Sequence, residues 1–342
     1  MKRALIVIMI GLMAAGTAMA QTWDQSKVVH RGTDTAIAAK DFGYTVKPQK
    51  KYTIAVVVKS AAIPVWESHI IAAKRAGANI GVNIVTYAPT KADNVEEQTR
   101  ILEDLVTAGV DAVVLAPANT DAIKRAVKDL LDAGIVVVYD NTMGPEDLDY
   151  LTFVGIDSAE AGVEIAKATG TMMHGQGKLL VLEGVPGQST SDLRVKGLME
   201  YVAKNFPGIT AESAVTNWQF DQGRRVTEDY ITKWGKDLKA VVAVGGNQAE
   251  GAVEALKTAG MTGVIVGGFD VQEPQYVAVK NGSETFTVSQ DVYDQAYLSV
   301  VAAVRALNGE AVPKLIKTPI TIVTQANLDA MDERPDALLK HR

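Results

Sequence analysis

Cysteine is absent from the 342 residues of the chain, and only four histidines are present. Without a thiol, neither a disulfide nor a thiolate metal site can form. The four histidines do not fall at spacings that would place two of them on one metal ion. The sequence therefore predicts neither a metal centre nor a bound cofactor.

An excess of positive charge is also lacking. The chain has 34 Lys and Arg against 40 Asp and Glu, a formal net charge of -6. Because binding to a phosphate backbone needs a basic face, this balance argues against a nucleic-acid partner. Hydrophobic residues make up 47% and charged residues 22%, as in ordinary globular proteins, and the length suits one large or two medium domains.

Long apolar runs occur only at the N-terminus. Lys2 and Arg3 precede an apolar run over 4–15, and small residues follow up to Ala20. This order is typical of a secretory signal peptide, residues 1–20, cut after Ala20. As a membrane anchor the run would be short for a hydrocarbon core of about 30 Å. No cysteine follows for lipid attachment, so we expect an exported protein that is not membrane-embedded.

Residues 21–50 have mixed polarity and no sustained period, and we interpret them as an N-terminal extension packed loosely on the surface. From Tyr52 onward, short apolar runs alternate with amphipathic stretches, which is typical of parallel strands covered by helices. The predicted strands are 54–58, 83–87, 112–115 and 135–139, and the predicted helices are 66–77, 95–108 and 120–133. Gly77, Gly109 and Gly134 end these helices, since glycine readily takes the left-handed conformation.

The alternation of short apolar runs with amphipathic stretches starts again after Asp149. Strand-like runs at 151–155, 178–182, 241–244 and 264–267 alternate with helix-like runs at 159–173, 191–205, 223–234 and 248–259, before a helix at 294–307 and a strand at 320–323. A single sheet of all these strands would exceed the size that is common, about 10 strands. The doubling therefore predicts two doubly wound α/β lobes with parallel sheets.

Ligands of open α/β sheets bind at the carboxyl ends of the strands. The residues that follow the predicted strands are rich in hydrogen-bonding side chains on an apolar scaffold, as a hydroxylated ligand requires. They are Lys59, Ser60, 116–119, Asp140, Asn141, 184–192, 245–247, Asp270 and Gln290.

At these positions the chain resembles a known family. The segments Ala116-Pro-Ala-Asn-Thr-Asp-Ala, Val137-Val-Tyr-Asp and Val266-Gly-Gly-Phe-Asp resemble type I periplasmic binding proteins of the ribose and simple-sugar group. So do 54–58, 153–162 and 184–187, in the same order. The resemblance extends from about residue 51 to 323 and rests on the whole set of motifs rather than on any one of them.

The resemblance implies two lobes joined by a hinge that the chain crosses three times. Lobe one would comprise 51–156 and 291–310, and lobe two 157–290 and 311–342. It also implies a monomeric periplasmic protein that closes around a small ligand and delivers it to the permease subunits of an ATP-binding-cassette importer. An autoinducer-2-type signal-binding protein, or a receptor subunit for a chemoreceptor or sensor kinase, is the alternative. A LacI-type repressor would carry a DNA-binding helix-turn-helix where this chain has an export signal.

The family's binding positions map onto several residues. Trp66 matches an aromatic that stacks on the sugar, although it could instead be ordinary core packing. Asp140 matches an acid that accepts hydrogen bonds from ligand hydroxyls, although it could instead be a turn residue. Asp270 and Gln290 match ligand contacts that could equally bridge the hinge.

Departures from the ribose pattern argue against ribose itself. Ala62-Ile63 replace an Asn pair, and Gly245-Gly246 replace Asn-Asp, which leaves Asn247 one step beyond. Asp192 lies near the position of an Arg. Asn141 replaces a second Arg, and Lys59 replaces a small polar residue. Lys59 with Asp140 and Asp192 is similar to the rhamnose- and autoinducer-2-binding branch.

The charged residues of the predicted cleft narrow the chemical class of the expected ligand. Asp140, Asp192 and Asp270 against Lys59 predict an acidic cleft, which favours a neutral sugar, a polyol or an amino sugar over a sugar acid or phosphate. Lys59 and Asp192 could instead form a solvated pair at the rim.

Catalysis is not expected. Ser68 and His69 are neighbours on a predicted helix, so their side chains point in different directions. The Gly-x-Ser-x-Gly and Gly-x-Gly-x-x-Gly motifs are both absent. The sequence therefore predicts a binding protein and not an enzyme.

Overall fold

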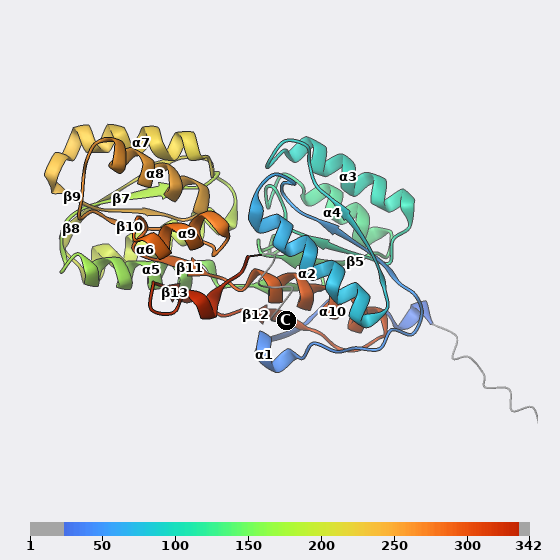
Figure 1. The fold of residues 1–342 in the computed structure, drawn as a ribbon. Coiled ribbons are helices and arrows are strands. Elements are labelled where there is room, and N and C mark those ends of the chain that lie inside the picture. The colour runs from blue at the N-terminus through green and yellow to red at the C-terminus, as the bar shows by residue number, and fades with distance from the viewer. Residues whose placement is uncertain (1–23, 335–342) are drawn as a thin grey trace, which may run out of the picture.

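A computed structural model describes residues 24–334. The predicted signal peptide and the last eight residues of the chain lie outside this range. The described chain forms two α/β lobes side by side, joined by extended segments (Figure 1). The predicted fold class, two doubly wound parallel-sheet lobes of the type I periplasmic binding proteins, is confirmed.

The first lobe contains a seven-stranded parallel sheet in the order β1-β12-β6-β5-β4-β2-β3. Its strands are β1 (Thr33–Ala38), β2 (Thr53–Val57), β3 (Asn83–Tyr87), β4 (Ala112–Leu115), β5 (Val136–Asp140), β6 (Thr152–Gly155) and β12 (Pro313–Lys317). Helices α2 (Pro64–Ile80) and α10 (Val292–Leu307) cover one face, and α3 (Val95–Ala108) and α4 (Lys124–Asp132) cover the other.

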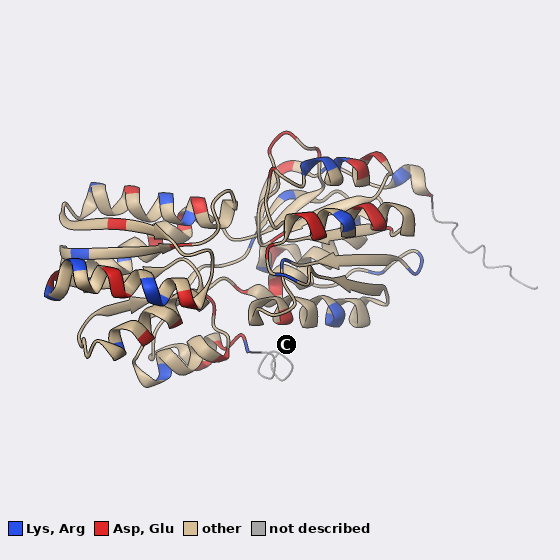
Figure 2. Ribbon diagram, turned by 90° about the horizontal axis from the view of Figure 1, so that it is seen from above, with Lys and Arg blue, Asp and Glu red and all other residues tan. Residues whose placement is uncertain are grey.

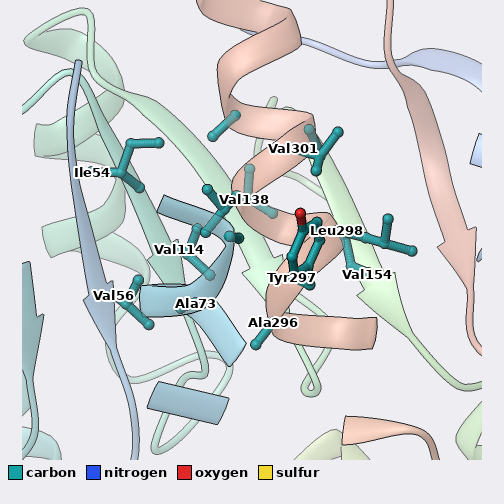
Figure 3. Packing of buried hydrophobic residues seen from close by; sticks show 14 of the residues in the cluster. Ile54, Val56, Ala73, Val114, Val138, Val154, Ala296, Tyr297, Leu298 and Val301 are labelled. Atoms are coloured by element: carbon teal, nitrogen blue, oxygen red, sulfur yellow. The ribbon is translucent and has the colours of Figure 1, made fainter. Parts of the chain in front are cut away.

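Both faces of the central strands are buried, which explains their continuous apolar sequences. Val56, Val114 and Val138 point toward α2 and α10 (Figure 3). The alternate residues Val57 and Val113 pack against α3 and α4. These two layers hold the carboxyl ends of β2, β4 and β5 at one edge of the lobe.

The second lobe contains a four-stranded parallel sheet in the order β10-β9-β7-β8. Its strands are β7 (Gln176–Glu183), β8 (Gly208–Val215), β9 (Leu238–Ala243) and β10 (Ile265–Gly267). Helices α5 (Ser158–Met172) and α6 (Ser189–Asn205) cover one face, and α7 (Phe220–Trp234) and α8 (Gly246–Thr258) cover the other. Helix α9 (Glu273–Asn281) and an antiparallel pair, β11 (Thr287–Ser289) and β13 (Thr321–Val323), complete it.

The chain passes between the lobes three times, after β6, after β11 and after β12. The predicted start of the tail of lobe two at residue 311 was wrong, because β12 pairs with β6 and β1 of the first sheet. In the sequence of β12 only Ile316 is fully buried, so no apolar run marks it as a strand.

The extension before β2 is an integral part of the first lobe, so the prediction of loose packing was wrong. After a short 3-10 turn, Gln25–Lys27, strand β1 pairs in parallel with β12. Helix α1 (Ala39–Phe42) buries Phe42, whose ring lies 4.3 Å from the Arg305 guanidinium. The extension was hard to recognise because β1 lies at the sheet edge and is mostly exposed.

Two of the three predicted glycine helix ends are confirmed. Gly109 and Gly134 have φ of 63° and 76°. Gly77 lies inside α2, which continues to Gly81 with φ of 92°. A Cβ at Gly77 would lie 2.3 Å from Cγ1 of Ile84, so this glycine lets the helix approach β3 closely.

Acidic and basic residues are interspersed along the outer helices of both lobes in Figure 2. Over residues 24–334, no helix combines the length and apolarity that crossing a membrane would need. Two further 3-10 turns, Gly235–Asp237 and Leu328–Met331, lie in the second lobe and in the segment after β13.

Candidate functional site

A cavity lies between the lobes, where the carboxyl ends of the two sheets meet. It has about 560 Å³ of empty space, part of it open to solvent. Its lining comprises Lys59, Ile63, Val65, Trp66, Asp93 and Asn141 from the first lobe, Gln188, Thr190, Arg194, Trp218, Gly245, Gly246, Asn247, Gln248 and Asp270 from the second, and Gln290 at a crossover.

Six of the nine predicted site residues line this cavity, namely Lys59, Trp66, Asn141, Asn247, Asp270 and Gln290. The other three lie elsewhere. The buried Ser60 hydroxyl accepts a hydrogen bond from the Ala62 backbone N–H at 3.0 Å. The exposed Asp192 carboxylate accepts one from the Gly187 N–H at 3.0 Å. Asp140 is buried and does not reach the lining.

Two indole rings line the cavity, one from each lobe. Trp66 lies on α2, with its ring 4.9 Å from that of His69. Trp218 follows β8, and its ring covers Gly184 and Gly245. A Cβ on Gly184 would come within 2.1 Å of the indole, and one on Gly245 within 2.7 Å, so both positions need glycine.

Trp218 was missed in the sequence because β8 was missed. This edge strand has only one buried residue, Ile209, and therefore shows no continuous apolar run. Asp93 lies beyond the end of β3 and was missed although that strand was predicted. Applying the strand-end rule to β3 as well would have pointed to the loop that contains Asp93.

Arg194 is the main cation that the sequence interpretation missed. Its side chain is 4% exposed, and the guanidinium lies 3.6 Å from the Phe269 ring centre. Nη1 donates to the Val244 carbonyl at 2.9 Å and Nη2 to Gln290 Oε1 at 3.0 Å. Burial lowers the pKa of Arg194 to about 10, against the attraction of Asp270. Two residues before Arg194, Asp192 is exposed and does not line the cavity.

Gln290 joins the lobes at the hinge. Its Nε2 donates to Asp270 Oδ1 at 2.6 Å, and its Oε1 accepts from Arg194 and, at 3.1 Å, from Nδ2 of Asn141. Asn141 also donates to Gln295 Oε1 at 3.0 Å. Burial raises the pKa of Asp270, while Arg194 and the Gln290 amide favour its charged form. Hydrogen bonds through Gln290 thus link the side chains of Asn141, Arg194 and Asp270.

Lys59 and Asp140 titrate far from their usual ranges because both are buried. Burial lowers the pKa of Lys59 to about 8, opposed first by Asp93. Burial raises the pKa of Asp140 to about 8, and its Oδ2 lies 3.7 Å from Nε2 of His69. Burial also lowers the pKa of His69 to about 4, so this histidine is neutral at pH 7.

The charges of the lining balance. Lys59 and Arg194 stand against Asp93 and Asp270, two positive and two negative side chains. The prediction of an acidic cleft was therefore wrong for the lining, because Arg194 contributes a positive charge there and Asp192 does not line it.

Several buried polar atoms on the lining have no hydrogen-bond partner among the described residues. They are Nε of Arg194, Oγ1 of Thr190 and Oε1 of Gln248, which are a donor, a hydroxyl and an acceptor. Because nearly all buried polar groups in proteins are paired, these atoms are suited to a polar ligand or water in the cavity.

Four lining residues other than glycine have a left-handed backbone, with φ of 57° at Asp93, 61° at Asn141, 59° at Trp218 and 70° at Asp270. This conformation is uncommon for such residues and collects where side chains must be aimed. All four directly follow or lie near strand ends, so backbone strain is concentrated at the cavity.

The residues considered for catalysis do not form a nucleophile–base pair. Ser68 donates to Gln272 Oε1 at 3.0 Å, whereas Nδ1 of His69 pairs with the Val65 carbonyl at 2.9 Å. Within residues 24–334, no group of three or more His, Asp or Glu is arranged to hold a metal ion.

Two doubly wound lobes, three crossovers and a polar, indole-lined cavity between them define a solute-binding protein of the two-lobed class. Residues 54–311 match the family model described as a periplasmic binding protein domain. The chain therefore belongs to this family, the solute-binding proteins of ABC transporters, as the resemblance implied. Its membership favours import over the signalling alternative.

Named relatives agree with this assignment. A protein of Rhizobium meliloti described as rhizopine-binding is 32% identical over 247 residues, which cover 69% of this chain and 78% of that protein. A D-ribose/D-allose-binding protein of Pseudomonas aeruginosa is 29% identical over 238 residues, 66% of this chain and 74% of that one. The structure of an ABC transporter solute-binding protein from Agrobacterium vitis with bound D-fucose has a TM-score of 0.78 at 29% identity, covering 84% of this chain and 98% of that one.

Proposed function

We propose that this protein binds a small neutral sugar, a polyol or an amino sugar between its lobes and presents it for import. The observation that carries the proposal is the lining itself. Trp66 and Trp218, from different lobes, share one cavity with the unpartnered polar atoms of Arg194, Thr190 and Gln248.

The chemistry of a sugar fits this combination. A sugar ring presents apolar C–H faces and a rim of hydroxyls, so indole rings suit the faces and fixed polar groups suit the rim. Hydrogen bonds to charged partners contribute about 1.5–3 kcal/mol each, which supports affinity at Asp270 and Arg194. The relatives named for ribose, allose and fucose have ligands of this kind.

The balanced charge of the lining favours a ligand without net negative charge. A sugar phosphate would bring about two negative charges into a site where Asp93 and Asp270 already oppose Lys59 and Arg194. A single ammonium group could instead be placed against either carboxylate. This extends the range from neutral sugars and polyols to amino sugars.

The remaining parts of the proposal concern the cell. Residues 1–20 would direct export to the periplasm and be removed after Ala20. The mature protein would act as a monomer, without catalysis, and its closed form would dock on ABC permease subunits. Recovery of the protein from a periplasmic extract with Gln21 at its N-terminus would test the export step.

A ligand screen tests the central claim. The mature protein is melted with D-ribose, D-allose, D-fucose, D-xylose, xylitol, myo-inositol and D-glucosamine, with D-glucuronate and ribose 5-phosphate as anionic comparisons. A ligand present at 100 times its Kd stabilises the folded state by about 2.7 kcal/mol, which is readily seen as a rise in Tm. Calorimetry then gives Kd, and mass spectrometry checks that the ligand is released unchanged.

The expected result is a rise in Tm with at least one neutral or amino compound, lost in Trp66→Ala and in Trp218→Ala. Lys196→Ala, an exposed position on α6 away from the lining, is the matched control and should bind as the unaltered protein does. Tight binding of only the acid or the phosphate would refute the proposal.

A further inference from the structure

The amide of Gln188 uses every hydrogen-bonding position that it has. Oε1 accepts from Nζ of Lys59 at 3.3 Å and from Nε1 of Trp218 at 2.9 Å. Nε2 donates to Oδ1 of Asp93 and to the carbonyl of Ala118, both at 2.8 Å. The side chain is fully buried, and two acceptor sites with two N–H groups are all that an amide offers.

The partners of this amide lie on both lobes. Gln188 directly precedes α6 in the second lobe. Trp218 also belongs to the second lobe and follows β8. Lys59, Asp93 and Ala118 follow β2, β3 and β4, the three strands at one side of the first sheet. One side chain therefore ties three strand ends of the first lobe to the second.

We infer that Gln188 is a latch between the lobes, a positioning residue that holds the closed form and aims two of the side chains that face the ligand. The inference rests on the proposed closure around a ligand. Because its four positions are already taken, the amide acts on the ligand through Lys59 and Trp218 and not by a hydrogen bond of its own.

The latch also determines what those two side chains offer. The indole N–H is the only donor of Trp218, and Gln188 accepts it, so Trp218 presents a ring face to the cavity. Lys59 has three N–H donors and gives one to Gln188, which leaves donors for the ligand. The site thus offers the ligand the apolar ring face of Trp218 on one side and the N–H donors of Lys59 on the other.

Opening the lobes would separate Gln188 from its three partners in the first lobe and expose them to water. Replacing Gln188 with Leu should raise the free energy of the closed form, because the buried Ala118 carbonyl and the part-buried Asp93 carboxylate would lose this donor there. Gln188→Glu keeps the acceptor for Lys59 and Trp218 but sets a carboxylate against Asp93. Both substitutions should therefore favour opening.

The absence of cysteine allows this to be measured with paired spin labels. Glu103→Cys on α3 and Arg225→Cys on α7 are exposed and lie on the two lobes, away from the crossover strands (Figure 1). Distances between the labels report the ratio of closed to open molecules, without ligand and during titration with the tightest member of the sugar panel. Gln275→Leu is the control, since that buried amide donates to Oε1 of Glu250 at 2.7 Å within the second lobe.

We expect both Gln188 variants to lower the closed-to-open ratio, and to raise the ligand concentration at half closure, by about tenfold or more, equivalent to about 1.4 kcal/mol. Gln275→Leu should leave both unchanged. If Gln188→Leu does not fold, Gln188→Glu decides alone. Gln188 variants that close as the parent does, or an equal opening in Gln275→Leu, would overturn the latch. Failure of every compound to bind the parent would instead refute the proposed function. The distances between the spin labels without ligand would still test whether Gln188 holds the lobes closed.

Discussion

Arg194 is the side chain whose removal should disturb the site most. Arg194→Met keeps an unbranched chain over Phe269 but removes the hydrogen bonds to the Val244 carbonyl and to Gln290. It also removes the cation that lowers the pKa of Asp270 against the effect of burial. Asp270 would then have to remain charged without this cation nearby or become protonated.

The expected cost follows from these contacts. Breaking a buried charged arrangement by removing one partner typically costs about 3–5 kcal/mol of stability, which we expect for Arg194→Met at pH 7. Asp270→Asn removes the charge that this substitution leaves unbalanced. The double variant should therefore be more stable than the sum of the two single losses predicts, by about 0.5–3 kcal/mol, the range for residues in one network.

Urea unfolding followed by circular dichroism gives the four free energies of this cycle. Arg125→Met, at an exposed position on α4, is the matched control and should change stability by about 0.5 kcal/mol or less. Two results would refute the coupling of Arg194 and Asp270 through Gln290. One is a loss of stability in Arg194→Met no larger than in the control, and the other is a double variant whose loss equals the sum of the single losses within about 0.5 kcal/mol.

Three other predictions concern single positions. Gly184→Ala should displace the Trp218 ring, because its Cβ would lie 2.1 Å from the indole, and weaken ligand binding about tenfold by calorimetry; an unchanged Kd would contradict this. The folded-state pKa of Asp140 is raised to about 8 from 3.8, so between these values the folded state holds the extra proton and stability falls as pH rises. Asp140→Asn removes this pH-dependent loss of stability. The free energy of unfolding of Asp140→Asn, relative to that of the parent, should therefore rise from pH 5 to pH 8 in urea titrations. Equal pH dependence of the two proteins would contradict this prediction. Phe42→Ala should cost about 3–5 kcal/mol by thermal unfolding because the ring is buried against the first lobe, and a loss under about 1 kcal/mol would show that the extension is dispensable.

The interior of each sheet could be predicted from sequence because both of its faces are buried. Runs such as Val136–Asp140 and Leu238–Ala243 are apolar at nearly every position and are bounded by helices. The strands β1, β8 and β12 lie at sheet edges or beside them and bury few residues, so their sequences have no comparable pattern. The boundaries of the lobes were displaced for this reason.

The site was partly predictable for the same reason. Lys59, Asn141 and Asn247 directly follow or adjoin strands that the pattern revealed, and they line the cavity. Trp218 follows a strand that the pattern did not reveal. Arg194 lies in the second turn of α6, where helical phase rather than distance from the strand decides that it faces inward while Asp192 does not.

The position of β12 has a consequence for the order in which the molecule can be assembled. The sheet β10-β9-β7-β8 is built from one continuous stretch of chain, so it can form as soon as that stretch is available. The first sheet needs β12 to join β1 to β6, and β12 follows almost the whole of the second lobe in sequence. Of these two parallel sheets, the one that starts first is thus completed last, and contacts of such long separation slow folding. Until residue 317 is in place, β1 has no neighbour among the described strands.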